Sequence, residues 1–211
     1  MTIDEHALDQ AAAQLWKASE AGEPCDPVAG LLEDGNVDDA YAVQNRNTER
    51  RLADGARLVG RKIGLTSASV QRQLGVSQPD YGMLFADMAV DEGGEVPVGR
   101  LLQPRAEAEI AFVLGRDLPH PDTTVAEVLR AIDFAVASIE IVDSRIADWK
   151  ISFVDTVADN ASSGLYVLGS SPVSIDDFDP LNCGMVMDLR GEPVSTGAGP
   201  VSYTHLTLPT S

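Results

Sequence analysis

The strand-like segment at 104–114, PRAEAEIAFVL, places two glutamates in an otherwise apolar run. Successive side chains of a β-strand point to opposite faces, so Glu107 and Glu109 share one face of the predicted strand. Two carboxylates a few ångströms apart on a buried sheet repel each other, unless a hard divalent cation lies between them. The segment therefore predicts a sheet that carries either a metal site or a solvated acidic face.

A third glutamate, Glu140, interrupts a second apolar strand pattern, AVASIEIVD at 135–143. Three carboxylates without His or Cys form an oxygen-only set of donors, which suits Mg²⁺ or Mn²⁺. The alternative is a solvated strand face with three unrelated glutamates, because a short paired motif is weak evidence alone. The apolar context of all three residues weakens that alternative without removing it, so both interpretations stay open at this point.

Two further segments carry candidate catalytic residues. In GRKIGLT, alternation puts Gly60, Lys62 and Gly64 on one face, and the glycines leave space for a ligand beside the lysine. Burial or a neighbouring cation would lower the pKa of Lys62 toward neutrality and suit it to proton transfer, whereas the alternative is a surface lysine. The segment QPDYG is typical of a turn, in which Asp80 could orient Lys62 or a water and Tyr81 could wall a pocket.

A polar stretch, DTVADNASSG at 155–164, separates two apolar segments. Asp155, Asn160, Ser162 and Ser163 are candidates to contact a ligand carboxylate, with Asn160 and Ser162 taken as substrate-binding residues. The alternative is that they cap a helix and close turns. The chain has neither a G-x-S-x-G motif nor a glycine-rich phosphate loop, which disfavours serine hydrolase and nucleotide-binding chemistry.

The charge balance excludes several partners. With 33 acidic and 15 basic side chains the net charge is -18, so we expect neither a nucleic-acid nor a membrane partner. A mean hydropathy of -0.03 and the lack of a long apolar run argue against a transmembrane protein. The sequence MTIDEHALDQ does not resemble a signal peptide, and the two cysteines form no C-x-x-C motif. We therefore expect a cytoplasmic protein.

The pattern along the chain changes from helical to strand-like near residue 57. We expect helices at 2–21, with Thr2 and Glu5 as a capping box, and at 38–53, with Arg46, Arg50 and Arg51 on the solvent side. Further short helices are expected at 67–75 and 123–134, the latter capped by a box of Thr124 and Glu127. The expected strands cover 57–65, 83–90, 108–114, 135–143, 164–169, 183–189 and 192–199.

The sum is an α+β chain with a mostly β core. We divide it into an N-terminal helical region at 1–56, a catalytic β domain at 57–200 and a tail at 201–211. The tail, VSYTHLTLPTS, resembles the translation of a sequencing-adapter read-through, so we expect it to be non-native and the chain to be truncated. An ordinary polar tail is the alternative.

The motifs in this order resemble the 2-keto-4-pentenoate hydratase branch of the fumarylacetoacetate hydrolase superfamily. They are VGRKIGLTSASVQRQLGVSQPDYGMLFADM, LQPRAEAEIAFVL, IEIVDSRIADWKI and FVDTVADNASSG. The resemblance implies a mixed β-sandwich or roll with a small N-terminal helical region, of which this chain lacks the C-terminal core strands. It assigns the metal-binding carboxylates to Glu107, Glu109 and Glu140, the active-site lysine to Lys62 and the pocket aspartate to Asp80.

The resemblance also implies an activity. Such enzymes are hydro-lyases that add water to 2-hydroxypenta-2,4-dienoate and give 4-hydroxy-2-oxopentanoate in the meta-cleavage breakdown of aromatic compounds. They need Mg²⁺ or Mn²⁺ and no organic cofactor, they form homo-oligomers, and they can associate with a pathway decarboxylase or aldolase. Hydrolases of the superfamily use a histidine to activate water, and no histidine stands in a matching place here, which favours a hydratase.

Two alternatives remain open at this point. The same scaffold and motifs occur in 4-oxalocrotonate decarboxylase and in hydratases of dicarboxylic dienoates, where an extra cation would bind the second carboxylate. Arg72, Arg105 and Arg145 are candidates for that cation. The other alternative is an inactive, truncated fragment with unpaired strand edges, which would aggregate.

Overall fold

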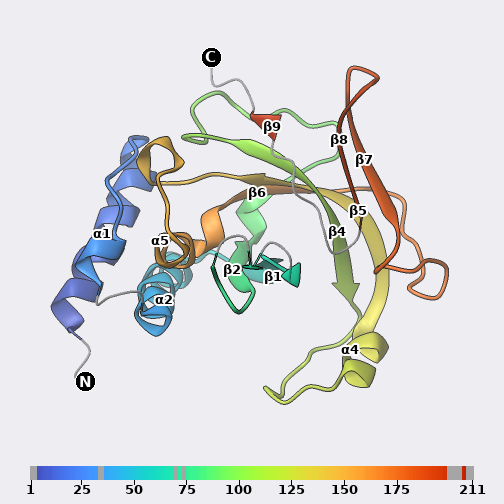
Figure 1. The fold of residues 1–211 in the computed structure, drawn as a ribbon, viewed down its shortest axis with the longest axis horizontal. Coiled ribbons are helices and arrows are strands. Elements are labelled where there is room, and N and C mark those ends of the chain that lie inside the picture. The colour runs from blue at the N-terminus through green and yellow to red at the C-terminus, as the bar shows by residue number, and fades with distance from the viewer. Residues whose placement is uncertain (1–3, 33–35, 69–70, 73–74, 199–205, 208–211) are drawn as a thin grey trace.

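The computed structural model describes residues 4–32, 36–68, 71–72, 75–198 and 206–207. A group of helices lies beside a curved sheet (Figure 1). The helices are α1 (Glu5–Ala21), α2 (Val37–Ala53), α4 (Val125–Ala131) and α5 (Phe153–Ala158). The strands are β1 (Leu58–Gly64), β2 (Asp80–Phe85), β3 (Ala89–Val90), β4 (Arg105–Leu114), β5 (Ile132–Val142), β6 (Ser163–Leu168), β7 (Gly184–Leu189), β8 (Glu192–Ala198) and β9 (Leu206–Thr207). Short 3₁₀ turns are η1 (Ala29–Leu31), η2 (Ala86–Met88), η3 (Ala147–Trp149) and η4 (Asn160–Ser162).

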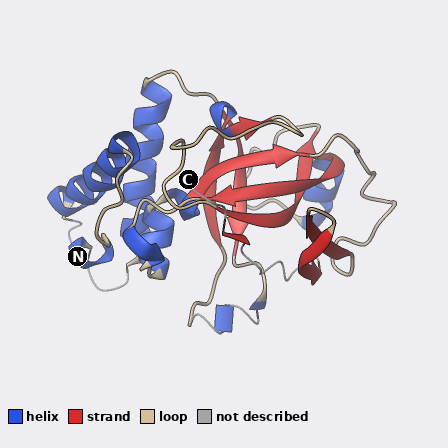
Figure 2. Cartoon of the chain, turned by 90° about the horizontal axis from the view of Figure 1, so that it is seen from above, coloured by secondary structure: helices blue, strands red, loops and turns tan. Residues whose placement is uncertain are grey.

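The strands form one larger sheet and two strand pairs. The larger sheet has the order β3-β6-β5-β4-β9, and the pairs are β1-β2 and β7-β8. Strand β3 runs parallel to β6, and the other neighbours are antiparallel. The long strands β4 and β5 arch over the β1-β2 pair. Helices α1, α2 and α5 lie together on one side of the sheet, and α4 lies at its other end (Figures 1 and 2). The fold class is therefore α+β with a mostly β body, as predicted.

Two apolar cores hold these parts together. The first joins α1, α2 and α5, and its fully buried residues include Leu8, Val43 and Val157. The second joins β2 to the larger sheet through Phe85, Ile141 and Leu165 and to η2 through Met88. Because α5 follows the larger sheet's strand β5 in the chain, the first core ties the N-terminal helices to the β body. The predicted domain limits at 56 and 200 stay a prediction.

The predicted helix ends are only partly correct. Helix α1 ends at Gly22 as predicted, with a left-handed φ of 69°, but its N-cap is Asp4, whose carboxylate accepts from the N–H groups of His6 and Ala7. The predicted N-cap, Thr2, lies outside the described residues. The predicted capping box of Thr124 and Glu127 is confirmed at α4. That helix is shorter than expected, because strand β5 begins at Ile132.

The prediction of one continuous strand at 83–90 is wrong. Strand β2 begins at Asp80 and ends at Phe85, and the η2 turn separates it from the two-residue strand β3. The prediction of a turn at QPDYG is also wrong in its second half, because Asp80 pairs with Gly64 of β1. Tertiary pairing with β1 has overridden the local turn preference of this segment.

The side of α2 that was predicted to face solvent carries arginines that contact neighbouring elements. Arg46 forms ion pairs with Glu5 and Asp9 of α1, and Arg51 pairs with Asp87 beside η2. All three arginines predicted there, Arg50 included, are only partly exposed. Long cationic side chains cover apolar surface with their stems, which explains why a polar stripe can lie against neighbouring elements.

Parts of two further predictions fall outside the described residues. Of the short helix expected at 67–75, Ala68, Gln71 and Arg72 are helical, while 69–70 and 73–74 lie outside. Of the tail at 201–211, only Leu206 and Thr207 are described, and their backbone pairs with Arg105 and Ala106 as β9. The non-native origin of the tail stays a prediction. Among the described residues, no helix is long and apolar enough to span a membrane.

Candidate metal centre

The pairing of β4 with β5 brings the three predicted glutamates together. Glu107 lies directly opposite Glu140, and Glu109 lies opposite Ser138. One carboxylate oxygen from each glutamate can be chosen so that all three lie within 4.8 Å of one another. Glu140 is buried, whereas Glu107 and Glu109 are half-buried. The strand alternation inferred from the sequence therefore holds, and the carboxylates converge on one face.

The electrostatics of this cluster fit a divalent cation. Burial and, next, the neighbouring charges of Glu140 and Glu107 together raise the pKa of Glu109 to about 7, against the opposing charge of Lys62. Burial also raises the pKa of Glu140, against the attraction of Lys62. Three carboxylates share a small, largely dry volume, so a hard cation would remove their mutual repulsion. An all-oxygen donor set of this kind fits Mg²⁺ or a similar ion.

Lys62 reaches this cluster from β1. Its Nζ lies 3.0 Å from Oε1 of Glu140 and donates a hydrogen bond of 3.1 Å to the carbonyl of Ala161. Burial alone would lower the pKa of Lys62, but the charges of Glu140, Asp80 and Glu107 outweigh it and raise the pKa. The predicted shift toward neutrality is therefore wrong in this arrangement, because the carboxylates around the lysine stabilise its charged form.

Asp80 lies on the same face as Lys62, at the start of β2. It pairs with Gly64, is 3% exposed, and burial raises its pKa while Lys62 opposes the shift. A Cβ at Gly64 would collide with the Asp80 carboxylate, so this glycine makes room for the acid rather than for a ligand. Oδ1 of Asp80 has no hydrogen-bond partner among the described residues, which leaves it available to a substrate or water.

The remaining predicted contacts are placed differently. Tyr81 pairs with Ile63 and so lies on the opposite face of β2 from Asp80, where its ring stacks on Tyr41 with centroids 4.5 Å apart. The side-chain amide of Asn160 forms hydrogen bonds with the backbone N–H and carbonyl of Met83. Ser162 is buried, and its hydroxyl has no partner among the described residues. The structure thus brings the predicted metal and catalytic residues together, but not Tyr81.

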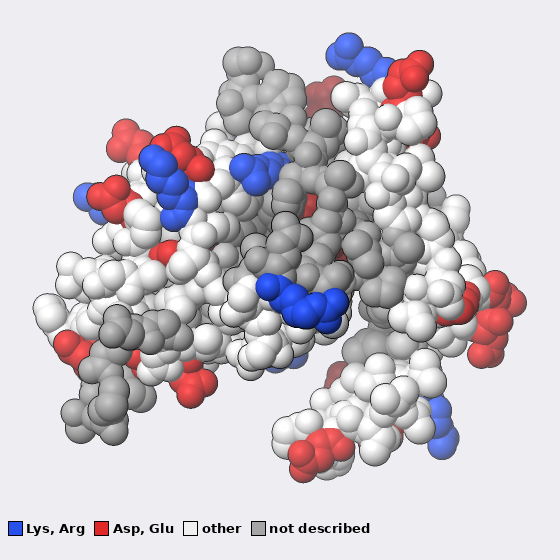
Figure 3. All heavy atoms as spheres, in the orientation of Figure 1, with Lys and Arg blue, Asp and Glu red and all other residues white. Residues whose placement is uncertain are grey.

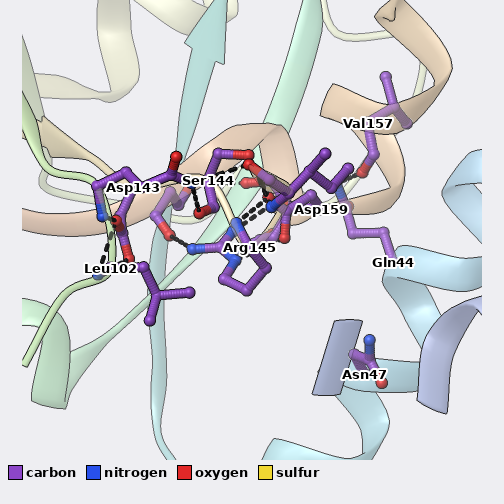
Figure 4. Close-up of polar contacts among 12 residues, drawn as sticks. Gln44, Asn47, Leu102, Asp143, Ser144, Arg145, Val157 and Asp159 are labelled. Carbon is purple, nitrogen blue, oxygen red and sulfur yellow. Dashed lines mark hydrogen bonds and ion pairs between the residues drawn. The ribbon is translucent and has the colours of Figure 1, made fainter. Parts of the chain in front are cut away.

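Arg145, a candidate cation for a second substrate carboxylate, is instead held by groups of the protein itself. Its guanidinium forms an ion pair with Asp159 and also donates to the carbonyl oxygens of Asp159 and Ser163 (Figure 4). Asp155, in turn, closes the capping box of α5 and accepts from the N–H groups of Val28 and Ala29. The signal for this network was the polar stretch at 155–164, for which both ligand contacts and caps or turn bonds were expected. Asp155 is a cap, and the hydroxyl of Ser163 closes a turn by donating to the carbonyl of Asn160.

The comparison with protein families decides the affiliation of the chain. The model for the C-terminal region of fumarylacetoacetate (FAA) hydrolase matches residues 52–206. The chain belongs to the fumarylacetoacetate hydrolase family. This match covers strands β1 to β8 and all five residues of the predicted metal and catalytic sets.

Two similar proteins are both named as hydratases. The chain is 58% identical over 193 residues to the TodF product hydratase of Pseudomonas putida strain F1, which covers 92% of this chain and 72% of the relative. It is 56% identical over 191 residues to 2-keto-4-pentenoate hydratase of Paraburkholderia xenovorans strain LB400, covering 90% and 71%.

A solved structure shares the fold. The 4-oxalocrotonate decarboxylase from Pseudomonas putida G7, complexed with magnesium and adipate, superposes with a TM-score of 0.86 at 34% identity. The match covers 94% of this chain and 75% of that one. The predicted fumarylacetoacetate hydrolase-like architecture is therefore confirmed.

Proposed function

We propose that this protein is a divalent-metal-dependent hydratase that adds water to 2-hydroxypenta-2,4-dienoate and yields 4-hydroxy-2-oxopentanoate. The observation that carries the proposal is the cluster of Glu107, Glu109 and Glu140 facing Lys62 in a chain at least 56% identical to two named hydratases. The proposal places the enzyme in the meta-cleavage breakdown of aromatic compounds.

The three glutamates would hold the metal ion, which we take to be Mg²⁺ or Mn²⁺. When bound there, the ion supplies a Lewis acid for the 2-oxo and carboxylate oxygens of the substrate. Magnesium accompanies the related decarboxylase structure, which supports an ion of this class. Glu107 and Glu109 are half-buried and so keep some contact with solvent, which supports access of a small ligand to the cluster.

Lys62 and Asp80 are our candidates for the proton transfers. The dienol loses its hydroxyl proton and gains a proton at C5, which gives the 2-oxo-3-enoate isomer. Water then adds at C4 and a proton is added at C3, so the net change is the gain of one water. The charged Lys62 can donate a proton, and the unpartnered Oδ1 of Asp80 can accept one from the attacking water.

The remaining substrate contacts and the context of the enzyme also belong to the proposal. The buried, unpartnered hydroxyl of Ser162 supports a hydrogen bond to the substrate, and Tyr81 and Asn160 are weaker candidates since both are engaged by protein groups. The family resemblance supports a cytoplasmic homo-oligomer that acts on a small 2-oxo or 2-hydroxy dienoate beside a pathway decarboxylase or aldolase. On the face shown in Figure 3, basic side chains are scattered among acidic ones rather than gathered in a stripe.

The second candidate is 4-oxalocrotonate decarboxylase, which the structural similarity at 34% identity favours. A diacid substrate would need a free cation for its second carboxylate. Arg145 cannot serve this purpose in the described structure, because Asp159 and two carbonyl groups occupy its guanidinium. The higher identity to hydratases favours the first candidate.

An activity assay separates the two. Freshly generated 2-hydroxypenta-2,4-dienoate is mixed with the protein in the presence of Mg²⁺, Mn²⁺ or a chelator, and the loss of dienol absorbance and the product are followed. We expect 4-hydroxy-2-oxopentanoate to form only with metal. Release of CO₂ from 4-oxalocrotonate without turnover of the dienoate would replace the proposal by the decarboxylase.

A further inference from the structure

The η4 turn has an unusual backbone. Its three residues, Asn160, Ala161 and Ser162, have φ values of 55°, 51° and 52°, all in the left-handed region. None of them is glycine, and L-residues adopt this region at a cost that is rarely met three times in succession. Strained backbone of this kind persists where the surrounding structure holds it, and it is frequent at functional sites.

One backbone carbonyl of the turn contacts Lys62, the lysine beside the glutamate cluster. The carbonyl of Ala161, its central residue, accepts a hydrogen bond of 3.1 Å from Nζ of Lys62. The same Nζ also forms an ion pair with the carboxylate of Glu140, at 3.0 Å. Two fixed partners, one on β5 and one on the turn, therefore set the direction of a lysine side chain that is otherwise long and flexible.

Asn160 fastens the turn to the strand pair that carries Lys62. Its Oδ1 accepts from the N–H of Met83 at 2.6 Å, and its Nδ2 donates to the carbonyl of the same residue at 2.9 Å. The neighbouring residue of β2, Gly82, allows this approach, because a Cβ there would collide with the carbonyl of Asn160. Gly82 is also the residue that pairs with Lys62 across β1 and β2.

Arg145 fastens the turn from the other side. Its Nη2 donates to the carbonyl of Asp159 at 2.5 Å, and its Nη1 donates to the carbonyl of Ser163 at 2.8 Å. These two residues directly precede and follow the left-handed turn. The ion pair with the Asp159 carboxylate, at 2.5 Å, locks the guanidinium in place (Figure 4). One planar side chain thus clamps both ends of the turn.

We propose that Asn160 and Arg145 are positioning residues for Lys62. They hold the left-handed turn so that the Ala161 carbonyl and Glu140 aim the lysine at the metal centre. The kinetic consequence of this inference rests on the proposed function, whereas the effect on the reactivity of Lys62 does not. Neither residue touches the substrate in this role.

The test compares three variants with the wild-type protein. Asn160→Asp keeps the shape of the side chain but cannot donate to the Met83 carbonyl. Arg145→Lys keeps the charge beside Asp159 but cannot span both ends of the turn. The matched control is Asn47→Ala, which removes an amide hydrogen bond of 3.1 Å to the carbonyl of Ala12 and the acceptor of Arg50 Nη1. These bonds lie within α2 and between α2 and α1, and neither partner belongs to the turn.

Two measurements are made on each variant. The first is kcat and KM for the dienoate, together with the affinity for Mg²⁺. The second is the rate at which an amine-reactive acylating reagent modifies each lysine, read by peptide mass spectrometry. The chain has only three lysines, so Lys17 and Lys150 serve as internal references for Lys62.

We expect kcat to fall about 10- to 100-fold in Asn160→Asp and in Arg145→Lys, the cost of misplacing a group by about 1 Å. The affinity for Mg²⁺ and KM should stay near their wild-type values, because β4 and β5 supply the metal ligands. Acylation of Lys62 should become faster relative to both references. The Asn47→Ala control should lower the melting temperature without either effect.

The inference is overturned if both turn variants only lower the melting temperature, like the control, and leave kcat and Lys62 acylation unchanged. If the wild-type protein does not hydrate the dienoate, the proposed function fails and the acylation rates decide the inference alone. Faster acylation of Lys62 would then support it, and unchanged acylation would contradict it.

Discussion

Glu107 and Glu140 lie directly opposite each other on adjacent antiparallel strands, with Glu109 two residues further along β4. Like charges in directly opposite positions destabilise a sheet, and in a dry environment the repulsion is stronger. The chain therefore stores repulsion in its central strand pair. A divalent ion bound there would relieve it, so we expect metal affinity and the stability of the fold to be coupled.

Removing one of these charges should abolish metal binding. In Glu107→Gln, we expect the affinity for Mg²⁺ to fall by more than about 100-fold, since even residues that merely support ligands contribute about 10- to 100-fold. Turnover of the dienoate should be lost with it. In a chelator, the same variant should melt at a higher temperature than the wild type, because less repulsion remains. Calorimetric titration and thermal melts check both effects.

The matched control is Glu49→Gln, which removes an equal charge from an exposed position on α2. It should change neither the affinity for Mg²⁺ nor turnover. Unaltered Mg²⁺ binding in Glu107→Gln would show that the glutamate cluster is not the metal site.

Metal affinity should depend on pH near neutrality. The pKa of Glu109 is raised to about 7, mainly by burial, and its protonated form is a poor ligand for a cation. Below pH 7 the metal must displace a proton, so the apparent affinity for Mg²⁺ should fall by up to about tenfold per pH unit. Calorimetry at pH 6 and pH 8, in buffers of different ionisation enthalpy, counts the protons. No proton release at pH 6 would contradict the raised pKa.

The stability of the metal-free protein should fall as pH rises, whereas the affinity for Mg²⁺ should rise. The pKa of Glu109 rises from 4.5 to about 7 on folding, so the native state binds more protons than the unfolded state between these values. The free energy of unfolding therefore falls as pH rises through this window. The raised pKa values of Glu140 and Asp80 act with the same sign.

Thermal melts in a chelator from pH 5 to pH 8 measure this dependence. The Glu109→Gln variant should show a weaker decline than the wild type, because its amide does not titrate. If the two proteins lose stability in parallel, Glu109 makes no contribution, and the decline comes from the general excess of acidic groups.

Two glycines on one face of β1 should respond differently to the same substitution. In Gly64→Ala, the new Cβ collides with the carboxylate of Asp80, so we expect a loss of about 1–3 kcal/mol in stability and a lower kcat. In Gly60→Ala, the new Cβ meets nothing within 4 Å, and the change should stay within about 0.5 kcal/mol. Equal effects in melts and kinetics would show that Gly64 is not needed to place Asp80.

The convergence of the glutamates could be predicted because strand alternation is a local rule. An E-x-E pair in a strand has both carboxylates on one face, whatever the rest of the fold does. The pKa of Lys62 could not be predicted in this way. The direction of its pKa shift depends on how many carboxylates surround the lysine. Those of Glu140 and Asp80 belong to other strands, β5 and β2.

Local sequence patterns were enough to infer the class of elements, the acidic pair on β4, the interrupted strand around Glu140 and the family resemblance. The tertiary structure alone decided that Asp80 belongs to a strand and that Tyr81 faces away from Lys62. It also decided that Arg145 clamps the turn that contacts Lys62. The physical reason is that hydrophobic periodicity and residue preference act over a few neighbouring residues. Strand pairing and buried ion pairs join groups far apart in the chain, and burial then shifts the pKa values of those groups.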